Sequence, residues 1–321
     1  MGGRNKMKKS LGIHHITAIV GNPQENVDFY ASVLGLRLVK KTINFDDPQT
    51  YHLYFGDDVA RPGSILTFFP WPNAYTGKKG AGQVEVISFM VPKNSLKFWE
   101  DRLQSYQIET KKEVRFDESY LTFSDPHGLK LEIVERESSQ LNQWNFNGVA
   151  PEVAIIGFAG ATLNSRRPER TGELLENTMG LEKIAENETH LRFKSTSEIG
   201  NTIEVLKTVS ERGTMGSGTV HHIAFRAKDA SDQLEWKQVL SEDGYQVTPV
   251  QDRNYFEAIY FREKGEILFE IATDTPGFAH DESIETMGES LMLPEWYEPQ
   301  REQIQQVLPT FTVRETHPTI K

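Results

Sequence analysis

Short apolar segments with the character of β-strands recur along the chain in the same local setting. Each is followed by a segment whose apolar residues fall three or four positions apart, which is the spacing of one helical face. The leading strand segments are HHITAIV (14–20), VEVISFMV (84–91), IIGFAGATL (155–163) and HHIAFRA (221–227). The helix candidates that follow them are residues 26–36, 95–103, 171–181 and 231–240.

Each unit then closes with further strands, the last of which is apolar. Turn residues separate two β-type runs in the hairpins FSDPHGLKLEIVE and FREKGEILFEIAT, which are close counterparts. The closing segments are SILTFF (64–69), LKLEIVE (129–135), NTIEVLK (201–207) and EILFEIA (266–272). The pattern predicts one β-α-β-β-β unit repeated four times, and therefore an α+β fold built from duplicated modules.

A polar stretch rich in Asn and Gln, residues 140–151, separates two halves of the repeat. We expect an N-terminal half over residues 11–140, with the first two units, and a C-terminal half over 151–275, with the last two. A tail follows at 276–321, with a short helix after Pro294 that Pro309 ends. The tail is expected either to cover a pocket or to form a contact within a homo-oligomer, and the sequence does not choose between them.

Two glycine-rich segments, KKGAGQ (78–83) and GTMGSG (213–218), precede the second and fourth units. Neither matches a phosphate-binding loop, and neither lies between a strand and a helix as such a loop requires. We interpret both as flexible connectors between modules.

Charge and cysteine usage narrow the classes of function. The formal net charge of -11 argues against nucleic acid and anionic membranes as partners. The absence of cysteine excludes disulfides, thiolate metal sites and cysteine nucleophiles. The most apolar run, residues 153–163, is too short to span a bilayer, and the basic start MGGRNKMKKS lacks a signal-type apolar core. We therefore expect a cytoplasmic protein.

Two His-His-Ile sequences begin equivalent strands of the repeat. Aligning GIHHIT with TVHHIAF places His15 at the position of His222. The counterparts in the second and third units are Val86 and, approximately, Gly157, which cannot bind a metal. A lone strand histidine is more often a packed residue than a ligand, but two at equivalent positions favour a shared site.

A carboxylate accompanies these histidines at the closing strand of the fourth unit. Glu270 corresponds there to Glu132, Glu204 and Thr67 of the other units. Two imidazoles and one carboxylate from separate strands form the facial triad of non-haem Fe(II) oxygenases, which leaves coordination positions open. Glu132 and Glu204 lack histidine partners, so we interpret them as structural or solvent-facing.

On these residues the chain resembles the vicinal oxygen chelate superfamily, and within it the glyoxalase-type ring-cleaving dioxygenases that act on hydroquinones. The resemblance covers nearly the full length. It is carried by GIHHITAIV, TYHLYFGD (50–57), PGSILTFFPW (62–71), VHHIAFRA, LFEIA and the tail segment LPEWYEPQREQIQQVLP (293–309). It implies mixed sheets in which paired modules form open barrels that cup a metal, with ligands from the first and fourth modules.

The resemblance also implies a site and a reaction. The metal ligands would be His15, His222 and Glu270, holding Fe(II), with Mn(II) as the alternative. The reaction would be an extradiol-type cleavage of an aromatic diol by O2. The residues implied around the substrate are His14, Thr17, His221, Arg253 and Tyr260.

The residues themselves allow some of these roles to be examined. A hairpin around REKG brings Tyr260 opposite Phe269 or Glu270. There its phenol could hydrogen-bond to a metal-bound oxygen, or its ring could simply pack in the sheet. Arg253 suits a negatively charged substrate oxygen or a solvated surface position equally well.

Strand alternation indicates where the side chains of the other three residues implied around the substrate point. Thr17 shares the face of His15, near the metal or in the core beside it. Alternation points His14 and His221 to the opposite face, so reaching the substrate would need a twist or bulge, after which His221 is the better acid-base candidate.

Two other functions fit the same fold. A glyoxalase-type lyase using Zn(II) or Ni(II) usually has a carboxylate or amide at both closing strands, whereas the first unit offers only Thr67. A small-molecule-binding resistance protein commonly lacks the complete ligand set. We assign no chemistry to His52, interpreted as packed, or to His127, interpreted as exposed in its turn. The aromatic residues around FFPW are interpreted as core rather than as a pocket lining.

Overall fold

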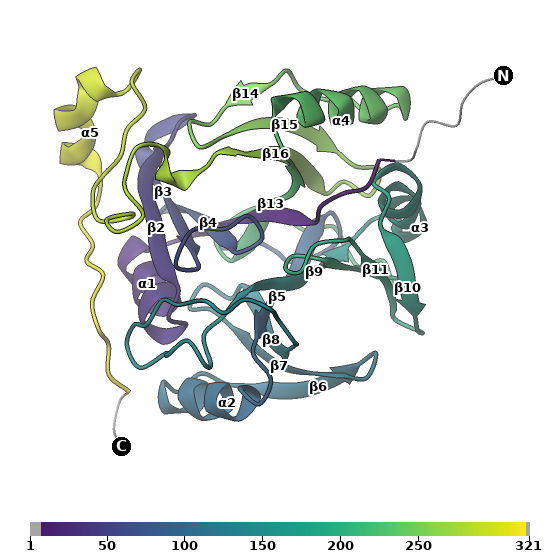
Figure 1. Ribbon diagram of the computed structural model, residues 1–321, viewed down its shortest axis with the longest axis horizontal. Coiled ribbons are helices and arrows are strands. Elements are labelled where there is room, and N and C mark those ends of the chain that lie inside the picture. The colour runs from purple at the N-terminus through teal and green to yellow at the C-terminus, as the bar shows by residue number, and fades with distance from the viewer. Residues whose placement is uncertain (1–7, 319–321) are drawn as a thin grey trace.

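The computed structural model describes residues 8–318, so the basic residues 1–7 and the last three residues of the tail lie outside it. The described strands form two mixed sheets of eight strands each, stacked one above the other in Figure 1, with helices on the outside. No helix within the described range is long and apolar enough to cross a membrane. The predicted fold class is confirmed.

The first sheet combines the first and fourth units, as the resemblance implied. Its strand order is β14-β15-β16-β13-β1-β4-β3-β2, with β1 antiparallel to β13 at the centre. The first unit contributes β1 (Ile13–Val20), β2 (Arg37–Asn44), β3 (Asp47–Gly56) and β4 (Ile65–Pro70). The fourth contributes β13 (Thr219–Ala227), β14 (Gln251–Asp252), β15 (Phe256–Arg262) and β16 (Leu268–Pro276).

The second sheet repeats this arrangement with the second and third units. Its order is β10-β11-β12-β9-β5-β8-β7-β6, with β5 antiparallel to β9 at the centre. The second unit contributes β5 (Gln83–Val91), β6 (Lys111–Arg115), β7 (Glu118–Ser124) and β8 (Lys130–Glu135). The third contributes β9 (Gly157–Asn164), β10 (Glu182–Glu186), β11 (His190–Lys194) and β12 (Thr202–Leu206).

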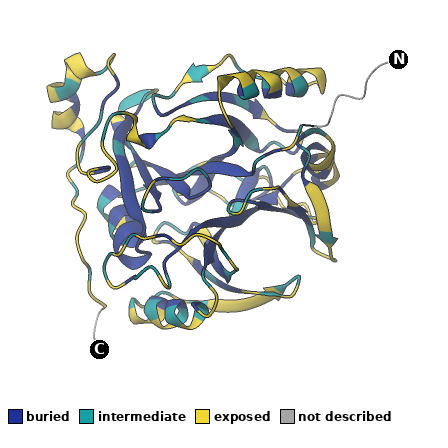
Figure 2. Cartoon of the chain, viewed as in Figure 1, coloured by how far each residue is buried: buried dark blue, intermediate teal, exposed yellow. Residues whose placement is uncertain are grey.

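One helix per unit packs its apolar stripe against a sheet (Figure 2). Buried Gln233, Trp236 and Leu240 in the fourth unit are spaced as one helical face requires. Burying an indole of this size contributes a few kcal/mol, on the order of 25 cal/mol per Å² of apolar surface. The helices are α1 (Pro23–Val27) with the π-helical turn η1 (Asp28–Val33), α2 (Leu96–Ser105), α3 (Pro168–Glu173) with η2 (Leu174–Thr178), and α4 (Ala230–Glu242).

The interpretation of the glycine-rich segments as free connectors is wrong. They lie side by side: Lys78 forms a β-bridge with Thr214, and Ala81 forms one with Arg212, just before the second segment. A Cβ atom on Gly80 would lie 2.3 Å from the backbone carbonyl oxygen of Glu211, just before the second segment. Glycine is therefore used here for close backbone approach.

The tail contains the predicted helix, α5 (Arg301–Val307), preceded by the 3-10 turns η3 (Phe278–His280) and η4 (Glu298–Gln300). It runs along the outer edge of β2 (Figure 1), where Lys41 bridges to Leu291. The buried ammonium group of Lys40 holds it through Asp281 at 2.6 Å and Glu282 at 2.5 Å. The tail thus covers the edge of β2, which would otherwise be exposed and open to pairing with another chain.

Glu132 and Glu204 are buried in a network of ion pairs inside the second barrel, which agrees with the structural interpretation. Arg115 donates to Glu132 and, through Nε at 2.8 Å, to Glu204. Arg192 donates a further pair of hydrogen bonds to Glu204. One guanidinium group therefore lies between two buried carboxylates.

The same network makes the stability of the protein depend on pH through Glu118. Burial opposes ionisation of this carboxyl, but hydrogen bonds and charge from Arg136 outweigh it and lower its pKa to about 2. A depressed native pKa contributes stability that is present above the unfolded value near 4.5 and is lost as the pH falls toward 2. After allowance for solvent screening, we expect Glu118 to contribute about 1–2 kcal/mol in this way.

We therefore expect Glu118→Gln to lower the free energy of unfolding near pH 6 and to make little difference near pH 2.5. Urea denaturation across this range measures both proteins. A difference that stays constant with pH would contradict the assignment.

Candidate metal centre

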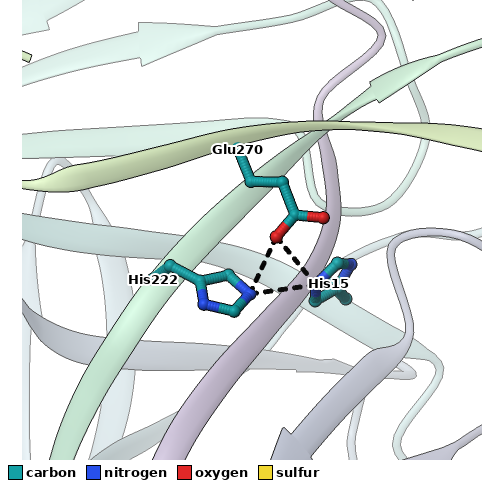
Figure 3. Close-up of side chains that lie close together, drawn as sticks. All are labelled: His15, His222 and Glu270. Carbon is teal, nitrogen blue, oxygen red and sulfur yellow. Dashed lines mark hydrogen bonds and ion pairs between the residues drawn. The ribbon is translucent and has the colours of Figure 1, made fainter. Parts of the chain in front are cut away.

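Three buried side chains converge at the centre of the first sheet: His15 from β1, His222 from β13 and Glu270 from β16 (Figure 3). The two Nε2 atoms lie 3.2 Å apart. Glu270 Oε2 lies 2.9 Å from Nε2 of His222 and 3.6 Å from Nε2 of His15.

Strand register explains why these residues meet. Glu270 pairs with Ala224 across the parallel strands β13 and β16, so it shares a face with His222 two residues earlier. His222 pairs with Thr17 across β1 and β13, and His15 lies two residues before Thr17. Alternation thus places all three on the concave face. Figure 3 shows them pointing toward one another from three strands.

The donor set fits a divalent metal. Bonds of about 2.1 Å at right angles would hold ligand atoms about 3 Å apart, close to the observed spacings. The side chain of Glu270 is fully buried, and within residues 8–318 neither carboxylate oxygen has a hydrogen bond of regular geometry, although Oε2 lies close to both imidazoles. Burial would raise the pKa of Glu270, but the two imidazoles outweigh this and hold the pKa well below its usual range. A buried, ionised carboxylate without a regular hydrogen bond is suited to binding a cation.

Strict alternation does not hold at His14 and His221, because each lies in a β-bulge, the irregularity that reaching the site was expected to need. The register between β1 and β13 shifts at both positions. Nδ1 of His14 consequently lies 2.9 Å from Nδ1 of His15, and Nδ1 of His221 lies 2.8 Å from Nδ1 of His222. Each bulge therefore supplies a partner for the ring nitrogen that faces away from the triad, which fixes the ring orientation of its neighbour.

Both partners are neutral imidazoles. Burial and the neighbouring His222 lower the pKa of His221 to about 3, and burial holds that of His14 well below its usual range. His221 also lines the cavity in front of the triad, whereas His14 lies behind it against Phe256.

Tyr260 pairs with Glu270, one of the two registers expected. Burial raises the pKa of Tyr260, so its phenol is protonated. Nε of Arg253 donates to the phenol oxygen at 3.3 Å, while the other guanidinium nitrogens contact Gln251 and Asp46. Arg253 and Tyr260 thus form one hydrogen-bonded pair in the cavity wall.

Thr17 is fully buried beside the triad, where its hydroxyl lies 2.8 Å from that of Thr67. Thr67 pairs with Thr17 as Glu270 pairs with Ala224, so Thr67 occupies the place of a second carboxylate. In the second barrel, Glu132 and Glu204 occupy the two equivalent places, because they pair with Ser88 and Thr162.

Strand pairing also identifies the residue of the third unit that corresponds to His222. Gly160 pairs with Ser88 across the centre of the second sheet, as His222 pairs with Thr17 across the centre of the first. The counterpart is therefore Gly160 rather than Gly157.

A cavity of about 490 Å³ opens in front of the triad. Aromatic side chains dominate its walls, and Phe69 and Trp71 are among them, so the interpretation of this segment as core alone is wrong. The cavity is lined by His15, Asn44, Phe45, Asp46, His52, Tyr54, Phe69, Trp71, His221, His222, Thr248, Gln251, Arg253, Phe256, Tyr260 and Leu268.

Two further histidine interpretations fail. His52 lines the cavity instead of serving only as packing, and its place next to Thr67 follows from β3–β4 pairing that the local pattern does not specify. His127 is not exposed: 8 % of its side chain is accessible, and its Nε2 accepts a hydrogen bond from the backbone N–H of Asn22.

Known proteins match the chain over most of its length. The sequence model of the family described as "Glyoxalase/Bleomycin resistance protein/Dioxygenase superfamily" matches residues 12–133 and 157–271. A Bacillus subtilis (strain 168) protein named "Putative ring-cleaving dioxygenase MhqO" is 61% identical over 96% of this chain and 99% of its own. The "Chlorohydroquinone/hydroquinone 1,2-dioxygenase" of Sphingobium indicum is 38% identical over 86% of this chain and 89% of its own.

A crystal structure agrees with these matches. It is that of a "putative dioxygenase" from Bacillus subtilis, which superimposes with a TM-score of 0.95 at 61% identity and covers 96% of this chain and all of that one. Together with the duplicated barrels and the family match, these likenesses establish that the chain belongs to the glyoxalase/bleomycin resistance/dioxygenase superfamily.

Proposed function

We propose that this protein is a ring-cleaving dioxygenase that uses Fe(II), held by His15, His222 and Glu270, to open a hydroquinone-type aromatic diol with O2. The observation that carries the proposal is the buried triad at the floor of an aromatic cavity. The names of the relatives support the same reaction class.

The missing fourth ligand favours this reaction over a glyoxalase-type lyase. Thr67 stands where a lyase would have a second carboxylate, and its hydroxyl is already engaged by Thr17 and His52. When bound, an iron centre with three protein ligands supplies positions at which a diol oxygen and O2 can bind side by side. We place ring opening next to a hydroxyl-bearing carbon.

The chain's own residues bind and orient the substrate. The walls formed by Phe45, Phe69 and Trp71 suit a planar ring and exclude water. The Arg253–Tyr260 pair presents a guanidinium charge and a phenol O–H, both of which stabilise negative charge on a substrate oxygen. His221, which lines the cavity as a neutral imidazole, is the group we assign to moving a proton.

Oxygen consumption tests the proposal. Protein loaded anaerobically with Fe(II) is expected to consume one O2 per methylhydroquinone and to give a product heavier by the mass of O2, and to act more slowly on catechol. An oxygen electrode and mass spectrometry measure both. Protein that binds one metal ion per chain but consumes no O2 with either compound would reject the dioxygenase and favour the lyase. Protein that binds no metal would reject both enzymes.

A further inference from the structure

The first and fourth units face each other across the triad with an approximate twofold relationship. In the fourth unit, Tyr260 pairs with Glu270 across β15 and β16. In the first unit, Tyr54 pairs with Thr67 across β3 and β4. Because Thr67 is the counterpart of Glu270, Tyr54 is the counterpart of Tyr260. The cavity therefore has a phenol on each side of the triad.

The two sides differ in the residue of the closing strand. Glu270 lies next to Tyr260, whereas Thr67, which has a shorter side chain, lies next to Tyr54 and is contacted by His52. His52, Tyr54 and Phe69 wall this side, and all three line the cavity. A substrate ring in the cavity would therefore lie beside Tyr54 as well as beside Tyr260.

Hydrogen bonds hold His52 and Tyr54 in one geometry. Nε2 of His52 lies 2.8 Å from the hydroxyl of Thr67, and Nδ1 lies 2.8 Å from the phenol oxygen of Tyr54. The imidazole is also packed between the rings of Tyr54 and Phe69, with centroids 4.1 and 4.4 Å away. With both ring nitrogens engaged, His52 serves to position the phenol.

The phenol of Tyr54 retains hydrogen-bonding capacity. Its oxygen makes no hydrogen bond other than that to His52 within the described residues. If Tyr54 donates to His52, its oxygen is free to accept, and if it accepts, its proton is free to donate. Burial raises the pKa of Tyr54 well above its usual value, so the phenol keeps its proton.

We propose that Tyr54 is a second substrate-binding phenol, held by His52, which hydrogen-bonds to a hydroxyl group of the aromatic substrate. This inference rests on the proposed function and deepens it: the substrate is held by hydrogen bonds from two phenols, Tyr54 of the first unit and Tyr260 of the fourth. Tyr54 contacts the substrate, and His52 acts as a positioning residue.

Equilibrium binding tests the inference without turnover. Hydroquinone is titrated anaerobically into Fe(II)-loaded protein in a calorimeter, so the readout is Kd. We expect Tyr54→Phe to weaken binding about tenfold, the usual effect of losing one buried hydrogen bond. His52→Ala should weaken it similarly. His52→Asn, which keeps a polar partner near the position of Nδ1, should remain closer to wild type. Metal content should be unchanged in all three.

Tyr51→Phe is the matched control, because Tyr51 lies on the same strand but packs against Phe311 of the tail. A Kd within twofold of wild type for Tyr54→Phe, or an equal loss in Tyr51→Phe, would overturn the inference. If either result is obtained while the wild-type protein binds hydroquinone and consumes O2, only this inference fails and the proposed function stands. Wild type that neither binds hydroquinone nor consumes O2 would overturn both.

Discussion

Replacing Glu270 with glutamine is expected to remove the metal and to lower kcat/KM for ring cleavage by at least about a thousandfold, on the order of 4 kcal/mol in transition-state free energy. The carboxylate is the only anionic member of the triad, and its side chain is fully buried. A neutral amide binds a divalent cation far more weakly. The side chain is otherwise isosteric, so the fold should persist.

Metal content after dialysis, measured by mass spectrometry, and oxygen uptake test this result. Glu204→Gln is the matched control, because Glu204 occupies the equivalent place in the second barrel and pairs with Thr162 as Glu270 pairs with Ala224. The control should keep one metal ion per chain. Full occupancy and wild-type turnover in Glu270→Gln would refute the assigned ligand set.

The second large effect is expected at Arg115, far from the triad. Arg115→Met should lower the free energy of unfolding by about 3–5 kcal/mol, because it leaves a buried carboxylate without its cation. Glu132 is the carboxylate that depends most on Arg115: burial raises the pKa of Glu132 despite Arg115, whereas Arg115 and Arg192 outweigh burial and lower the pKa of Glu204. Urea denaturation measures the loss.

A double variant separates the orphaned charge from lost packing. Arg115→Met with Glu132→Gln removes the uncompensated charge and should recover more than half of the stability. Lys97→Met is the control for an ordinary ion pair, since its partner Asp101 and Lys97 itself are both mostly exposed. Such a pair contributes about 0–1 kcal/mol. A loss below 1 kcal/mol in Arg115→Met would show that the network is not structural.

The repeat and the fold class could be predicted from the hydrophobic pattern within each unit. The three triad residues could be predicted because aligning the units places His15 and His222 at equivalent strand positions and Glu270 on the closing strand, and strand alternation keeps each on one face. Strand alternation also indicated that His14 and His221 could reach the site only through a twist or bulge, and the structure has a bulge at each position.

The rest of the cavity depends on contacts between strands and segments that no local pattern specifies. His52 looks like a packed strand residue until β3 pairs with β4 and brings it to Thr67. The glycine-rich connectors look flexible because the sequence does not reveal that each is the other's partner. Lys40 is buried because the tail supplies Asp281, 241 positions further along the chain, and Glu282 as its partners.

The pairing of β1 with β13 has a consequence for biosynthesis. His15 and His222 are 207 positions apart. During synthesis, β1 therefore cannot pair with β13 until most of the chain has left the ribosome. At about 5–20 residues per second this wait is on the order of 10–40 s. During that time the apolar β1 has an unpaired edge that invites aggregation. The nascent chain therefore needs protection, by a chaperone or by transient contacts of its own, until the last module emerges.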